Sequence, residues 1–182
     1  MKRYLMTFVA IAVMLGALVM TNSCKSISPE EAARRAYADS VANNVAQLQL
    51  KYRKFVLTAD RITINQSTLI NVSDNTNFVL ADSLTGVVQV SPRFAGGPNS
   101  LGGFTVTGDI TNYEMKTDKS GDVTVTYRLS APIGSTDVHI LLRKGSNAAE
   151  ATLTPTFNTG RATLYGEIKA LGKHEYFEGR SF

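Results

Sequence analysis

The strongest constraint on the fold of this chain is an alternation of apolar and polar residues that continues from Arg53 almost to the C-terminus. The sequence VTVTYRLS at residues 123–130 and the sequence DVHILLR at residues 137–143 show it most clearly. Successive side chains of a β-strand point to opposite faces of its sheet, so a period of two predicts strands with one face in the core and one in water. The chain is therefore expected to form a mainly β domain.

Short turn-forming segments separate the alternating runs. Each contains Gly, Asn, Asp, Ser or Pro and is too short for a crossover helix, which predicts antiparallel hairpins at residues 82–86, 118–122, 132–135, 145–147 and 158–160. A sheet of about eight strands curls or folds over, so we expect a curled sheet, a sandwich or an open barrel capped by an N-terminal helix. The pattern does not separate these forms. An outer-membrane barrel is disfavoured, because the outward positions carry Thr, Arg, Lys and Asp where lipid requires apolar residues.

A single amphipathic helix is predicted over residues 29–51. Ser28 suits the N-cap, Pro29 the first helical position and Glu31 the third, which together form a capping box. An apolar stripe at three- and four-residue steps is expected to pack this helix on the sheet: Tyr37, Val41, Val45, Leu48 and Tyr52. The alternative is a helix that stands partly free as a stalk.

The first 24 residues resemble a bacterial lipoprotein signal. Lys2 and Arg3 precede an uncharged stretch at residues 5–20, and the only cysteine, Cys24, follows three polar residues. We expect cleavage after residue 23, lipid such as palmitate on Cys24, and a tether over residues 24–28. The alternatives are a cleaved signal without lipid, because Thr21 and Ser23 depart from an ideal lipobox, and an uncleaved signal anchor. Without a second cysteine, no disulfide can form within the chain.

Charge argues against a nucleic-acid partner. Two of the 19 basic residues lie in the signal, so the 159 residues of the mature chain carry 17 basic and 15 acidic side chains. No basic run is longer than two residues, as in the pair Arg34 and Arg35. A nearly neutral domain without a basic stripe is not typical of nucleic-acid binding.

A glycine-rich loop is the densest local signal in the predicted β domain. Residues 96–103 contain four glycines, but no Lys-Ser or Lys-Thr pair follows and a strand succeeds the loop, so it does not match a phosphate-binding loop. It is either a structural turn or a recognition loop. The residues assigned to the recognition loop are Arg93, Phe94, Gly97, Pro98, Asn99, Gly102 and Gly103.

Catalytic and metal-binding patterns are absent from the sequence. His139 lies on the polar side of a predicted strand and His174 in the tail at residues 172–182, and neither has companions at metal-ligand spacing. No G-x-S-x-G elbow occurs, and a lipidated Cys24 is no nucleophile. We therefore expect a noncatalytic protein without metal or cofactor.

Several short segments together resemble the domain of unknown function DUF4251. They are FVLTAD at 55–60, TNFV at 76–79, VQV at 88–90, GPNSLGG at 97–103 with FTVTG at 104–108, and GSNA at 145–148. The resemblance covers about residues 51–171, which includes the β domain expected at residues 52–171 and makes up nearly the entire mature domain. It implies an exported Bacteroidota protein, often a lipoprotein, and brings no activity or catalytic residue with it.

The expected export signal and the expected fold together predict where the protein is found and what it does. Residues 25–28 carry no acid, which by resemblance to lipoproteins of these bacteria favours the outer membrane facing the periplasm, with the cell surface as the alternative. We expect a noncatalytic envelope lipoprotein, anchored to the membrane through its lipid, whose β domain binds a protein partner or an envelope component. The alternatives are a carrier of a small apolar ligand inside a curled sheet and, third, a hydrolase of unrecognised type.

Overall fold

The computed structural model describes residues 27–66, 69–91, 104–157 and 160–172. The chain divides into two compact units, residues 1–35 and 36–182. The elements follow in the order α2 (Pro29–Tyr52), β1 (Lys54–Ile64), β2 (Ile70–Asn71), β3 (Phe78–Asp82), β4 (Thr85–Val90), β5 (Phe104–Thr117), β6 (Val123–Ala131), β7 (Gly134–Leu142), β8 (Ala148–Pro155) and β9 (Ala162–Ala170). Within the described ranges, no helix is both long enough and apolar enough to span a bilayer.

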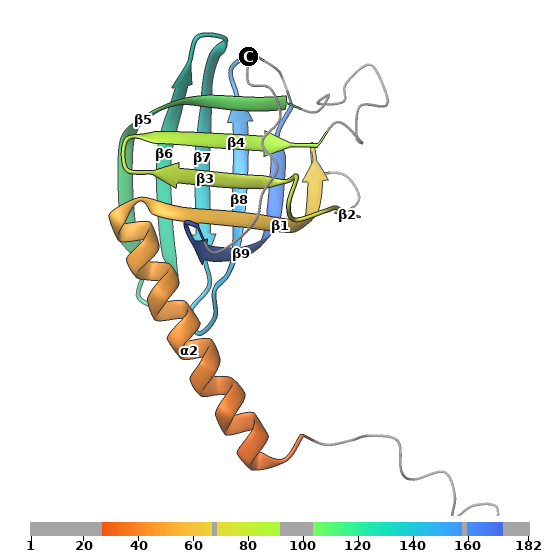
Figure 1. Ribbon diagram of the computed structural model, residues 1–182, viewed down its shortest axis with the longest axis vertical. Coiled ribbons are helices and arrows are strands. Elements are labelled where there is room, and N and C mark those ends of the chain that lie inside the picture. Colours follow the sequence, from red (N-terminus) through yellow and green to blue (C-terminus); the bar gives the residue numbers. More distant parts are fainter. Residues whose placement is uncertain (1–26, 67–68, 92–103, 158–159, 173–182) are drawn as a thin grey trace, which may run out of the picture. The chain divides into compact units, whose positions relative to one another are not determined.

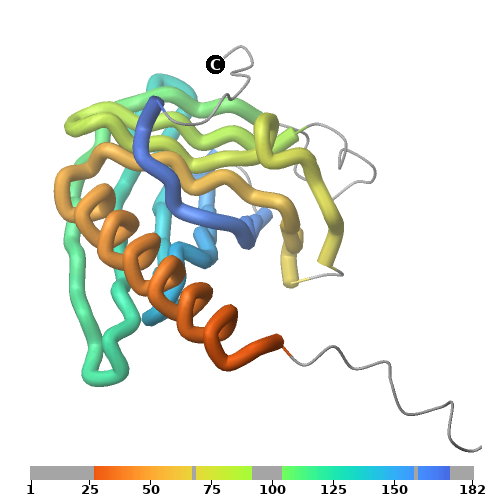
Figure 2. Tube along the Cα trace, turned by 60° about the horizontal axis from the view of Figure 1, so that its bottom comes forward, coloured from red at the N-terminus to blue at the C-terminus, as the bar shows by residue number. Residues whose placement is uncertain are grey.

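Eight of the nine strands close into an up-and-down barrel. From β3 to β9 each strand pairs with the next one along the chain, and β1 pairs with both β3 and β9 (Figure 1). Figure 2 shows β9, in blue, beside β1, in orange, where the barrel closes. The short β2 pairs only with β1. All pairings are antiparallel, as predicted, and the barrel settles the choice between barrel and sandwich.

The barrel interior is filled by side chains from all eight strands. Its largest fully buried residues are Phe55, Leu57, Ile62, Leu129, Ile140, Leu142, Leu153 and Leu164. An eight-stranded barrel has an interior just wide enough for side chains to fill or for one small ligand. Here apolar side chains fill it, so hydrophobic burial along the whole barrel axis stabilises the fold.

The outer face of β1, β3 and β4 is apolar as well. Val56, Phe78, Leu80 and Val87 point away from the barrel interior, yet they are buried and form a second cluster, against which Leu171 packs. The prediction of one wet face is therefore wrong for these three strands. Their sequences are nearly continuous apolar runs, which is typical of strands covered on both faces.

The helix begins where the sequence predicts. The Ser28 hydroxyl accepts a hydrogen bond from the Glu31 backbone N–H at 3.2 Å, and the Ala32 N–H donates to the Ser28 carbonyl at 2.9 Å. The Glu31 carboxylate pairs one turn on with Arg35 at 2.6 Å. These contacts satisfy helix donors that have no partner within the helix and place an acid at its positive end.

The helix packs on the barrel, as predicted, and does not stand free as a stalk. The prediction of which face packs is wrong. Its buried residues are Asn43, Ala46 and Leu50, with Ala46 and Leu50 in the barrel core. The predicted stripe is exposed, with exposed fractions of 74% for Tyr37, 44% for Val41, 43% for Val45, 50% for Leu48 and 64% for Tyr52. Small Ala46 permits a close approach, and polar contacts hold the buried side chain of Asn43.

Those polar contacts reach the turn between β7 and β8. The Asn43 amide donates to the backbone carbonyls of Arg143 at 3.0 Å and Ser146 at 2.6 Å. The Tyr113 hydroxyl donates to the Leu50 carbonyl near the end of the helix at 2.6 Å. A buried amide with two carbonyl acceptors is satisfied, so Asn43 serves as a packing residue despite its polarity.

Candidate functional site

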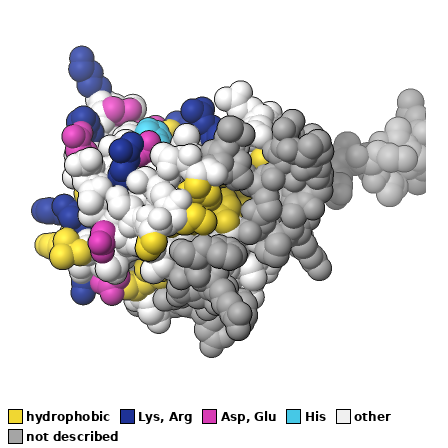
Figure 3. Space-filling model, turned by 90° about the horizontal axis from the view of Figure 1, so that it is seen from above, with side chains coloured by type: hydrophobic (Ala, Val, Ile, Leu, Met, Phe, Trp, Pro, Cys, Tyr) yellow, Lys and Arg dark blue, Asp and Glu magenta, His cyan; other side chains and the backbone are white. Residues whose placement is uncertain are grey.

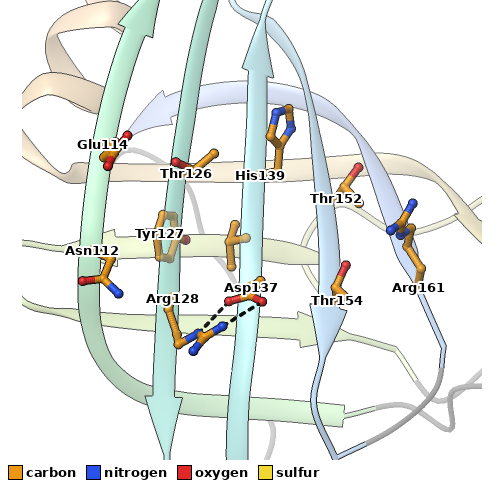
Figure 4. A pocket seen from close by; sticks show the side chains of 11 residues that line it. Asn112, Glu114, Thr126, Tyr127, Arg128, Asp137, His139, Thr152, Thr154 and Arg161 are labelled. Atoms are coloured by element: carbon orange, nitrogen blue, oxygen red, sulfur yellow. Dashed lines mark hydrogen bonds and ion pairs between the residues drawn. The ribbon is translucent and has the colours of Figure 1, made fainter.

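A shallow groove of about 680 Å³ lies on the outer wall of strands β5 to β8, with Arg161, just before β9, at one end (Figure 4). It is lined by Asn112, Glu114, Thr126, Tyr127, Arg128, Asp137, Val138, His139, Thr152, Thr154 and Arg161. Tyr127 and Val138 belong to the buried barrel core, and the other nine are polar or charged. The groove is therefore a polar surface over an apolar core.

Strand register brings the polar groups of this groove together. His139 on β7 is the direct partner of Thr126 on β6 and of Thr152 on β8. Alternate residues of a strand share a face, so Arg128, Asp137 and Thr154 lie one step along the same wall (Figure 4). Hydroxyl, imidazole and guanidinium groups from three strands thus face the same hollow.

Arg128 and Asp137 form a bidentate ion pair in the groove. The Arg128 Nε and Nη2 atoms donate to the two Asp137 carboxylate oxygens at 2.7 and 3.1 Å. The Arg128 hydrogen bond holds the pKa of Asp137 below its ordinary value, and the carboxylate in turn raises the pKa of Arg128. Both groups are charged at neutral pH. At the opposite rim, the Lys116 hydrogen bond likewise lowers the pKa of Glu114.

Arg161 stands at the far end of the groove, just before β9. Its backbone N–H donates to the Asn65 side-chain oxygen at 2.8 Å, and its carbonyl accepts from the Asn65 N–H at 2.7 Å. These bonds fix the backbone that carries the guanidinium. Within the described part of the chain, no carboxylate forms an ion pair with Arg161, so this cation differs from the paired Arg128.

A second hollow of about 380 Å³ continues the groove toward β1. It shares Thr152 and Arg161 with the first and adds Thr63, Gln66, Glu150, Thr163 and Tyr165. Figure 3 shows another side of the molecule, where Lys and Arg, Asp and Glu, and a histidine in cyan lie on one region of the described surface. His139 is the one histidine within the described ranges. The two hollows together form a polar surface over six strands, β5 to β9 and β1.

A bulge in β5 shapes one rim of the groove. The pairing of β5 with β6 shifts between Thr111 and Glu114, and Asn112 has a φ of 54°. Asparagine tolerates this left-handed conformation better than most residues do. Bulges redirect strands and often occur beside binding sites. The bulge places Asn112 and Glu114 at the edge of the hollow.

The residues predicted for recognition and lipidation lie outside the described ranges. These are Cys24 and the loop residues Arg93, Phe94, Gly97, Pro98, Asn99, Gly102 and Gly103. The structure does describe the strands on either side of the loop. The Asn77 side-chain oxygen accepts from the Ser91 N–H at 2.9 Å, and the Thr105 hydroxyl donates to the Gln89 side-chain oxygen at 3.1 Å. Both ends of the loop thus start from hydrogen-bonded positions.

His139 is exposed, as expected, and joins Asp137 in the groove. Arg143, which the sequence places in the same phase, instead pairs with Asp122 and Glu150, each at 3.3 Å. His174 lies outside the described ranges. Among the residues that the structure describes, no three His, Cys, Asp or Glu side chains are grouped to hold a metal ion. Sequence reasoning did not single out Arg128, Thr152 or Arg161, because only strand register aligns them.

Two stacked tyrosines lie beneath the groove and differ in one hydrogen bond. The rings of Tyr113 and Tyr127 are 5.6 Å apart and nearly parallel, and burial raises the pKa of both hydroxyls. Tyr113 bonds the Leu50 carbonyl, whereas the buried Tyr127 hydroxyl has no partner among the described residues. A buried hydroxyl without a partner costs free energy.

Tyr127→Phe is expected to raise the free energy of unfolding by about 1 kcal/mol, because it removes an unsatisfied buried hydroxyl. The matched control Tyr113→Phe is expected to lower it by about 1 kcal/mol through loss of a made hydrogen bond. Urea denaturation of both variants measures the two effects. A loss of stability in Tyr127→Phe as large as that in Tyr113→Phe would contradict the assignment.

Comparison with known proteins places the chain in a family. Residues 38–168 match the model of a domain of unknown function, DUF4251. The chain belongs to the DUF4251 family. The resemblance drawn from the short sequence segments is thereby confirmed.

A solved structure supports the same assignment. The crystal structure of a DUF4251 family protein from Bacteroides eggerthii DSM 20697 is similar to this chain with a TM-score of 0.71 and 34% sequence identity. The similarity covers 81% of this chain and 99% of that protein. No curated protein matches the sequence.

Proposed function

We propose that this protein is a noncatalytic envelope lipoprotein, anchored to the membrane through Cys24, whose barrel binds a polar envelope component in the outer groove. The observation that carries the proposal is the groove itself, about 680 Å³ in volume with nine polar or charged lining residues. The filled barrel interior favours binding on the outer wall over carriage of an apolar ligand inside. The lipoprotein-like signal supports the proposed localisation, which is the outer membrane with the domain facing the periplasm.

The two carboxylates of the groove are better suited to binding than to acid–base catalysis. A general acid or base works best with a pKa near the working pH. Here the Arg128 hydrogen bond lowers the pKa of Asp137, and the Lys116 hydrogen bond lowers that of Glu114. Both carboxylates are thereby held ionised and already paired, which suits hydrogen bonding to a ligand.

The side chains also indicate the chemistry of the ligand. Thr126, Thr152 and Thr154 offer hydroxyl groups that both donate and accept hydrogen bonds. Arg161, with no ion-pair partner among the described residues, can bind a carboxylate through two parallel hydrogen bonds. A component that carries both hydroxyl and carboxylate groups fits these threonines and Arg161. The glycan–peptide polymer of the cell wall carries both kinds of group.

Co-sedimentation of the purified chain with isolated cell-wall sacculi tests the groove. Arg161→Gln should weaken binding about tenfold, because a charge-assisted hydrogen bond contributes roughly 1.5–3 kcal/mol. The matched control is Arg61→Gln, which removes an exposed arginine that lines neither hollow. Failure of the unaltered chain to sediment, or equal losses in both variants, would reject the groove as the binding site.

Cell fractionation tests the anchor separately. A Cys24→Ala chain should leave the membrane fraction, since one or more acyl chains supply the hydrophobic contact with the bilayer. Retention of this variant in the membrane fraction would contradict the anchor without affecting the groove.

A further inference from the structure

The outward face of α2 carries an apolar stripe that no described part of the barrel covers. Tyr37, Val41, Val45, Leu48 and Tyr52 are 43–74% exposed. The residues that pack on the barrel, Ala46 and Leu50, lie on the opposite side of the helix, because each residue advances about 100° around a helix axis. All five stripe residues lie within the compact unit of residues 36–182.

The spacing of the stripe is that of a coiled-coil seam. Val41, Val45, Leu48 and Tyr52 follow one another at steps of four, three and four residues, which are the d and a positions of a heptad. Position 38, one heptad before Val45, holds a small alanine. A β-branched residue at a, here Val45, next to leucine at d, here Leu48, favours two-stranded assembly.

The charges around the stripe suit a second copy of the same chain. Flanking positions hold Ser40, Asn44 and Gln49, and Lys51 is the only charged residue on this face between residues 36 and 52. Like charges would repel between identical helices, and they are nearly absent. A helix that lies on a membrane typically carries several Lys and Arg residues beside Trp, Phe or Leu, which does not describe this stripe.

We propose that this face of α2 docks against the same face of a second copy, with Val45 and Leu48 at the centre of the seam. The inference does not depend on the groove. The seam is short, with four residues between positions 41 and 52. A standard interface buries about 800 Å² on each partner, so we expect a smaller interface and a dimer whose population rises with concentration.

Cysteine cross-linking of the full chain in membranes tests the pair. Val45→Cys lies near the centre of the stripe, so it meets its own copy in either helix orientation. A short bismaleimide should convert it to a species of twice the chain mass. The matched control is Ser40→Cys, exposed on the same helix but outside the seam, which should give about tenfold less cross-linked dimer at equal expression. The unaltered chain controls for reaction at Cys24.

A second variant separates the seam from the fold. Leu48→Glu in the Val45→Cys chain should reduce the cross-linked dimer about tenfold, because a carboxylate in an apolar seam loses its hydration. Leu48 is half exposed, so the thermal melting of the domain should change little, and sacculus binding should be unchanged. Equal cross-linking at positions 40 and 45, products of a different mass, or an unaffected Leu48→Glu variant would overturn the proposal. An absence of cross-linked dimer in the Val45→Cys chain itself would overturn it as well.

Discussion

Leu50→Ala should lower the free energy of unfolding by about 2–5 kcal/mol, the usual cost of removing a fully buried leucine side chain. Leu50 is 0% exposed and packs in the barrel core together with Ala46. The truncation leaves a cavity where α2 meets the barrel, and the backbone there is held by the Tyr113 hydroxyl on the Leu50 carbonyl. The site therefore cannot collapse freely to fill the space. Denaturant unfolding of the purified chain measures the loss.

Leu48→Ala is the matched control, because it makes the same chemical change two residues earlier on the same helix. Leu48 is 50% exposed, so its truncation should cost only about 0.5 kcal/mol in a dilute, monomeric sample. The predicted amphipathic face would reverse this order, with Leu48 in the core. A larger loss for Leu48→Ala than for Leu50→Ala would therefore contradict the observed packing.

The helix shows why a correct element was predicted with the wrong face. Capping at Ser28 depends on neighbouring residues, so it could be read from the sequence. The packing face depends on groups far along the chain, since the Asn43 amide bonds the carbonyls of Arg143 and Ser146, 100 and 103 residues away. The apolar stripe was the stronger local signal, but contacts with distant residues place Asn43, Ala46 and Leu50 on the buried face.

The strands could be predicted from local alternation of apolar and polar residues. The closure of these strands into a barrel could not. Alternation reports which side chains share a face, and that pattern is the same in a sandwich and a barrel. Closure depends on β1 pairing with β9, which brings Phe55 opposite Ala170. The apolar outer face of β1, β3 and β4 was also missed, although continuous runs such as residues 78–81 carried the signal.

The residues of the candidate site are brought together by the register between paired strands. Their spacing in the sequence does not predict this register. Arg128 and Asp137 are nine residues apart, and only the β6–β7 pairing makes them direct partners. His139 gains its neighbours Thr126 and Thr152 in the same way, from two different hairpins. On the sequence, each of these residues is an ordinary polar position of a strand. Their shared hollow arises from the curvature of the closed sheet.

Gly166 lies where β1 and β9 close the barrel, and Gly166→Ala should disrupt this pairing. Gly166 on β9 lies opposite Ala59 on β1, next to a register shift between Ala59 and Arg61. A Cβ at position 166 would stand 1.8 Å from the Thr58 carbonyl oxygen and 2.8 Å from the Ala59 Cα. Both are backbone atoms of the paired strand, so relief of the clash requires β1 and β9 to separate.

The expected loss for Gly166→Ala is at least about 4 kcal/mol, in the range reached only by severe steric or core defects. Soluble expression and thermal melting measure it. Gly86→Ala is the graded control, because its Cβ would lie 3.0 Å from the Leu80 carbonyl oxygen and 3.2 Å from Ile110 side-chain atoms. Overpacking of that size costs about 1–3 kcal/mol. If Gly166→Ala melted within a few degrees of the unaltered chain, β1 and β9 could not pair as closely as described, and the barrel would have to be open at that seam.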